Sequence, residues 1–134
     1  MPCSELKTTT ASHRPANMFL FRAMLLVDCI RALAVTNGHA DVAEPRPTKE
    51  TAWQASELIS EIPLWLIGDP DVDSFFGEVH LSWTAGSKQV VVMCFPNREP
   101  LIHNYQRVPG YPSAHSIEAA SVDRIAYWLG WLRA

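Results

Sequence analysis

The feature that most constrains the fold is a series of three β-favouring segments joined by very short connections. Across residues 77–83 apolar and polar side chains alternate, which is the period-two pattern of a strand with one buried face. A short turn at 85–87 separates this strand from 89–95, and a second turn at 96–100 precedes the last segment, 101–107. Because neither connection has room for a crossover helix, the spacing predicts a three-stranded antiparallel meander.

The middle segment, 89–95, differs from the first because almost all of its residues favour strands and it shows no clear alternation. A continuous run of this kind is typical of a central strand. We therefore expect it to be covered on both faces of the sheet.

Helical patterns flank the meander. The first runs from a cap at Asn17 to about Val35, before an Asn37-Gly38 stop signal. The second runs from a cap at Thr48 to about Ile62, where Pro63 ends it. A last helix, capped by Ser116, carries an apolar stripe of Ile125, Trp128, Leu129 and Leu132. The predicted fold is α+β, with a three-stranded meander, about three helices and the order ααβββα.

Length and composition indicate one domain. The chain has 134 residues, of which 48% are hydrophobic, so it has enough apolar material for one core. Residues 1–16 show no periodicity and are expected to form a flexible tail, ahead of a single domain over 17–134. The net charge of −3 excludes a strong basic footprint, so we expect no direct nucleic-acid partner.

Three further classes of site are not expected. Charged residues interrupt the apolar stretch 18–35, so it is not expected to cross a membrane. Cys3, Cys29 and Cys94 are odd in number and widely spaced, which predicts reduced thiols in a cytoplasm. The dispersed Cys and His residues complete no ligand set, so neither a structural metal nor a cofactor is expected.

Acidic residues concentrate in one part of the chain. Between Thr48 and Gly77 there is one lysine against six carboxylates. Asp69, Asp71 and Asp73 alternate as in the first half of a calcium loop, but the turn glycine and the closing glutamate of such a loop are missing. The pattern therefore predicts a solvated acidic turn.

Several aromatic side chains lie off the apolar stripes. Trp83 and Trp128 fit the core. Aromatic residues in loops or beside a stripe often anchor interfaces, although they can also pin a loop to the sheet. Together with the acidic residues after helix two they form the predicted partner-binding set: Trp65, Asp69, Asp71, Asp73, Phe75, Phe76, Tyr111 and Trp131.

A catalytic alternative remains open. Cys94, His80, His103 and His115 lie in or beside the strands, where a thiolate and a base, or several imidazoles, could meet. No nucleotide-binding loop or hydrolase motif accompanies them. The alternative function is a small enzyme that uses Cys94, His80 and His103.

One resemblance bears on function. The run Ala-Ser-Glu-Leu-Ile-Ser-Glu-Ile-Pro at 55–63, the run Gly-Glu-Val-His-Leu-Ser-Trp at 77–83 and the later Tyr105 resemble a pattern of small uncharacterised bacterial and phage proteins. In these proteins a helix ending in proline leads to a D-G-E-φ-x-φ-x-W strand (φ apolar) and a three-stranded meander. The likeness spans about residues 52–133, although here Ser74-Phe75-Phe76 lies between the aspartates and Gly77.

The resemblance carries no catalytic residue. It implies a small α+β protein of accessory or mobile-element type, a group in which antitoxins and phage-encoded inhibitors of host defence, such as anti-CRISPR proteins, are common. We therefore expect a non-catalytic, cytoplasmic module that binds and inhibits a larger protein. The partner could be a nucleic-acid-handling complex contacted through its basic surface, and a homodimer is left open.

Overall fold

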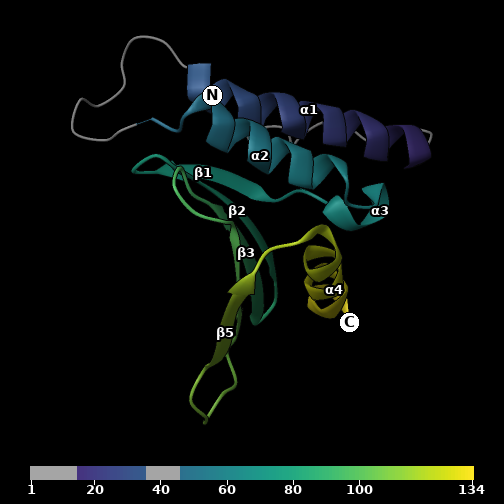
Figure 1. Cartoon of the computed structure of the whole chain (residues 1–134). Coiled ribbons are helices and arrows are strands. Elements are labelled where there is room, and N and C mark those ends of the chain that lie inside the picture. Colours follow the sequence, from purple (N-terminus) through teal and green to yellow (C-terminus); the bar gives the residue numbers. More distant parts are fainter. Residues whose placement is uncertain (1–14, 36–45) are drawn as a thin grey trace.

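The computed structural model describes residues 15–35 and 46–134, and its centre is one antiparallel sheet (Figure 1). Five strands pair in sequence order, β1-β2-β3-β4-β5. The predicted meander is confirmed as β2, β3 and β4, and one further strand lies on each side of it. The strands are β1 (Asp71–Phe75), β2 (Glu78–Ala85), β3 (Lys88–Cys94), β4 (Leu101–Gln106) and β5 (Ala114–Ala119).

The described residues form four helices: α1 (Pro15–Val35), α2 (Lys49–Ser60), α3 (Leu64–Ile67) and α4 (Val122–Arg133). The predicted cap of α2 is confirmed, because the Thr48 hydroxyl accepts a hydrogen bond from the Thr51 N–H at 3.2 Å. The predicted cap of the last helix is wrong. Ser116 lies in β5, and the cap of α4 is Ser121, whose hydroxyl accepts from the Arg124 N–H at 3.2 Å.

Two predictions about the N-terminal part concern residues that the structure does not describe. The Asn37-Gly38 stop signal lies outside the described residues, as does most of the expected tail. Residues 15 and 16, which the sequence assigned to that tail, are the first two residues of α1.

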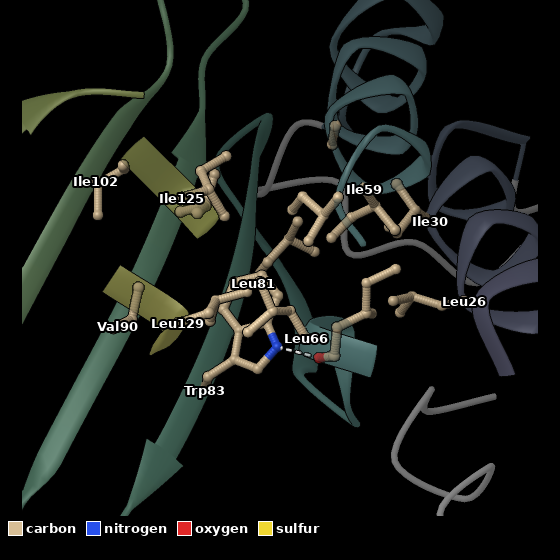
Figure 2. Packing of buried hydrophobic residues seen from close by; sticks show 14 of the residues in the cluster. Leu26, Ile30, Ile59, Leu66, Leu81, Trp83, Val90, Ile102, Ile125 and Leu129 are labelled. Carbon is tan, nitrogen blue, oxygen red and sulfur yellow. Dashed lines mark hydrogen bonds between the residues drawn. The ribbon is translucent and has the colours of Figure 1, made fainter. Parts of the chain in front are cut away.

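Helices α2 and α4 cover one face of the sheet, and α1 packs on α2 (Figure 1). The strands send Leu81, Val90 and Ile102 into this interface, where they meet Ile59 of α2 and Leu129 of α4 (Figure 2). The predicted core positions of the two tryptophans are confirmed: Trp83 is buried and Trp128 is half-buried against the core.

The opposite face of the sheet carries none of the described helices, and we call it the open sheet face. Strand β3 was expected to be covered on both faces, and this is wrong. Its buried residues, Val90, Val92 and Cys94, alternate with half-buried ones such as Val91 and Met93. The sequence of β3 shows no alternation because its residues on both faces are apolar. The described helices nevertheless pack on one face only.

Of the two described cysteines, the predicted reduced thiol is wrong for Cys29. Cys29 of α1 is disulfide-bonded, whereas Cys94 is a free, buried thiol. Over residues 15–35 and 46–134, no helix combines the length and hydropathy that a membrane span requires.

Candidate functional surface

The candidate site follows the edge strand β1. The sequence placed its residues on helix two and in a solvated acidic turn, and the turn is wrong, because 71–75 is a strand. We call the set Trp65, Asp69, Asp71, Asp73, Phe75 and Phe76 the β1 edge surface. Trp65 and Asp69 precede the strand in sequence, Phe75 ends it and Phe76 follows it, so the aspartates and Phe75 are spread along a strand of roughly 15 Å.

Strand pairing brings the acidic and aromatic side chains of β1 to one face. Asp71, Asp73 and Phe75 alternate along the strand, and all three are exposed. Asp73 pairs with His80 of β2, and Phe75 pairs with Glu78. Paired residues in an antiparallel sheet share a face. The carboxylates and the ring of Phe75 are therefore presented on the same side, which is the open sheet face.

The turn that ends β1 has an unusual residue. Phe76 and Gly77 connect β1 to β2, and both have positive φ, 48° and 85°. Positive φ at both central residues is the requirement of a type I′ hairpin turn, which glycine, asparagine and aspartate satisfy with little strain. A phenylalanine in this region is strained, and of the described non-glycine residues Phe76 is the only one with positive φ.

Aromatic contacts order the tip of this hairpin. The rings of Phe75 and Phe76 lie edge to face, with centroids 4.7 Å apart, and Phe75 lies 6.3 Å from the His80 ring. His80 Nε2 lies 2.8 Å from Glu78 Oε1, in a hydrogen bond between neighbouring positions of one strand face. Phe75 and Phe76 nevertheless remain 53% and 54% exposed, so the cluster presents apolar surface to solvent.

The start of β1 is held by the helices. Helix α3 buries Leu66 and leaves Trp65 65% exposed. The Trp65 carbonyl accepts a hydrogen bond from Arg133 Nη1 at 3.0 Å, and the Ile67 carbonyl accepts one from the Trp83 indole at 2.5 Å (Figure 2). These two hydrogen bonds attach the backbone of α3 to α4 and to the sheet, so the backbone that carries the exposed indole of Trp65 is held in place.

Asp69 is paired. Its Oδ2 lies 3.3 Å from Nη1 of Arg22 on α1, and both side chains are about one third exposed. This exposed pair contributes little to stability because water screens it. It compensates part of the charge of the β1 edge surface, which stays net negative through the aspartates of β1.

Two predicted partner-binding residues lie elsewhere. Tyr111 is 75% exposed in the connection between β4 and β5, at the opposite end of the strands from the Phe76-Gly77 turn. Trp131 packs edge to face on Trp128, with centroids 5.2 Å apart, and the Lys88 ammonium covers its ring at 4.9 Å. Trp131 therefore belongs to the packing of α4.

Two neighbours of the surface were missed by sequence reasoning. Glu78 falls in the strand predicted at 77–83 and His80 was named as a catalytic candidate, but the register places both beside the β1 carboxylates. The alternation Asp-Val-Asp-Ser-Phe before a Phe-Gly turn was the available signal, since it is the first half of a hairpin.

The geometry gives the catalytic alternative no support. Cys94 is fully buried on the helix-covered face, and burial raises the pKa of its thiol to about 12. Its partner in the register is the buried Val79, whereas His80 and His103 belong to the open sheet face. The backbone of the sheet thus separates the thiol from both imidazoles. His103 and His115 pair edge to face at 5.6 Å, and no group of three metal-ligating side chains occurs among the residues that the structure describes.

Comparison with protein-family models, with curated proteins and with solved structures gives no match.

Proposed function

We propose that this protein is a non-catalytic binding module that occludes a larger protein partner through the β1 edge surface. The observation that carries the proposal is Phe76, a bulky residue held at a positive φ of 48° with 54% of its surface exposed. Strain of this kind costs of order 1 kcal/mol or more, and it is found where function requires an otherwise unfavourable residue. Asparagine would satisfy the turn at lower cost, so the ring itself supports a role in recognition.

The chemistry of the surface fits a partner that is apolar and basic. Phe75, Phe76 and Trp65 are large enough to act as buried anchors once a partner removes water from them. Asp71 and Asp73 precede Phe75 along β1 on the same face, where they would steer a positively charged site and set the register of docking.

Proteins that handle nucleic acids present basic sites of this type. We therefore infer an inhibitor of such a complex: a phage-encoded inhibitor of host defence of the anti-CRISPR type, or an antitoxin. That assignment is an analogy from the acidic and aromatic surface and from the resemblance of residues 52–133 to small phage and bacterial proteins.

Affinity capture with matched variants tests the proposal. The baits are the wild-type chain, the double variant Phe75→Ala/Phe76→Asn and the control Tyr111→Ala, which removes an even more exposed ring at the other end of the sheet. A partner is accepted if the wild type and the control retain it and the double variant loses it, and if the wild type inhibits the purified partner's own activity. Equal retention by the double variant would contradict the proposal.

A further inference from the structure

The two edges of the sheet differ in how they are protected. On β1, Asp73 Oδ1 accepts a hydrogen bond from the backbone N–H of Ser74 at 2.9 Å, and a second aspartate adds charge to the strand. Charges and occupied backbone groups are the devices that keep an edge strand from pairing with another chain. The β1 edge is thus guarded against strand addition.

The β5 edge lacks these devices. Its sequence is Ala-His-Ser-Ile-Glu-Ala, without proline or lysine, and five of its six residues are exposed. Its one acidic residue, Glu118, turns to α4, where it accepts hydrogen bonds from Arg124 Nε at 3.0 Å, Arg124 Nη2 at 2.9 Å and the Trp128 indole. No described strand pairs with the outer side of β5.

The direction of the backbone groups on β5 follows from one hydrogen bond. The Ala120 N–H donates to the Pro100 carbonyl at 2.9 Å, toward β4. In an antiparallel ladder the direction alternates, so Glu118 and Ser116 also face β4. The N–H and C=O groups of His115, Ile117 and Ala119 therefore point outward, where a further strand would find them.

We propose that β5 pairs with β5 of a second copy of this chain across a two-fold axis centred on Ile117. An antiparallel pair related by a two-fold axis normal to the sheet keeps the open sheet face of both copies on the same side. Ile117 then pairs with itself, and His115 pairs with Ala119 of the other copy. All outward groups of these three residues find partners in this register.

The side chains of β5 favour a second copy of this chain as the strand that pairs with it. Ile117 is 59% exposed, and the two-fold axis places it opposite its own β-branched equivalent, a favourable cross-strand pair. No like charges meet, because the charged Glu118 is directed to Arg124 of its own chain. Within one chain, Ile117 pairs with His103 and His103 pairs with Val91, so these three side chains form a row on the open sheet face. The dimer would continue this row into the second copy.

The dimer leaves both β1 edges free at the ends of a ten-stranded sheet. Nine strand spacings separate them, a distance of roughly 40 Å. Each β1 edge surface would remain exposed, so the dimer would be bivalent toward a repeated or two-fold partner. The dimer does not depend on the proposed function, because its residues and those of the β1 edge surface do not overlap.

Sedimentation of the full chain over a range of concentrations tests the inference. We expect a monomer–dimer equilibrium for the wild type, with dimers about tenfold weaker in Ile117→Lys and in Ile117→Glu, because like charges then oppose each other across the axis. An equimolar mixture of the two variants should restore the dimer, since lysine then meets glutamate. This rescue distinguishes self-pairing at Ile117 from a loss of folding.

A second pair of variants separates the two edges. Ile117→Pro removes an outward N–H and should abolish the dimer while the monomer stays folded, because a proline is tolerated where the N–H faces solvent. Ser74→Pro does the same on the guarded β1 edge and should leave the dimer unchanged. A wild-type chain that sediments as a monomer at all concentrations, or a charge mixture that stays monomeric, overturns the proposal.

Discussion

Phe75 and Phe76 are consecutive in sequence, yet their rings meet edge to face with centroids 4.7 Å apart. Successive side chains of a strand point to opposite faces, so neighbours in a regular strand do not touch in this way. The contact arises because the strand ends at Phe75 and the positive φ of Phe76 turns the second ring back. The hairpin tip thereby joins two aromatic rings into one exposed patch.

Replacing Phe76 with asparagine should stabilise the protein. Asparagine tolerates positive φ better than phenylalanine, so Phe76→Asn is expected to raise the free energy of unfolding by about 1 kcal/mol. Urea denaturation measures this difference. The matched variant Phe76→Val, which places a β-branched residue at the same φ, should lower stability instead. An Asn variant less stable than the wild type would show that the ring contributes more by packing than it costs in strain.

Removing the indole donor of Trp83 should destabilise the base of the β1 edge surface. Trp83→Phe leaves the buried Ile67 carbonyl without its 2.5 Å hydrogen bond and a small void beside it, a loss of about 2–3 kcal/mol. Trp128→Phe is the control, because its indole bonds to the partly exposed carboxylate of Glu118 and a smaller loss is expected. Equal losses in the two variants would contradict the assigned role of the Trp83 bond.

Cys94 should be unreactive in the folded protein. Burial raises the pKa of its thiol from 9.0 to about 12, so the folded state favours the protonated form. Stability from this group is complete below pH 9.0 and decreases as the pH rises toward about 12. Alkylation at Cys94, followed by peptide mass spectrometry at neutral pH, should require unfolding. Rapid labelling under native conditions would revive the catalytic alternative.

The carboxylate of Glu118 should make the stability of the protein decrease at acidic pH. Hydrogen bonds from Arg124 and Trp128 hold the pKa of its carboxyl below the ordinary 4.5. This contribution is present above pH 4.5 and is lost as the pH falls through the lowered value. The variant Glu118→Gln should therefore show a flatter decline of melting temperature in acid. An acid profile identical to that of the wild type would refute this role for the carboxylate.

The sequence predicted the elements whose local pattern agrees with their packing. Strands β2 to β4 have high strand propensity and short turns, and α2 has a clear cap at Thr48. Strands β1 and β5 were missed because aspartate, serine and alanine disfavour strands in isolation. Both are edge strands, and pairing specifies them: Asn104 Nδ2 of β4, for example, donates to the Ser116 hydroxyl of β5 at 2.7 Å.

The candidate site was predicted in composition but not in geometry. The aspartates and phenylalanines of 69–76 were singled out, yet an acidic turn was expected where the chain continues as an edge strand. Trp131 was grouped with them because it lies beside the apolar stripe of α4, and local composition cannot show that Trp128 and Lys88 cover it. Propensity is local, whereas the face a side chain occupies depends on strand register.

The most direct test of the account is the affinity of a purified, captured partner for two versions of the chain. Isothermal titration should give a dissociation constant at least about tenfold weaker for Phe75→Ala/Phe76→Asn than for the wild type, because two anchors of the β1 edge surface are lost. The double variant should remain folded, with a cooperative thermal transition. Unchanged affinity in a folded double variant would contradict the claim that this surface binds the partner.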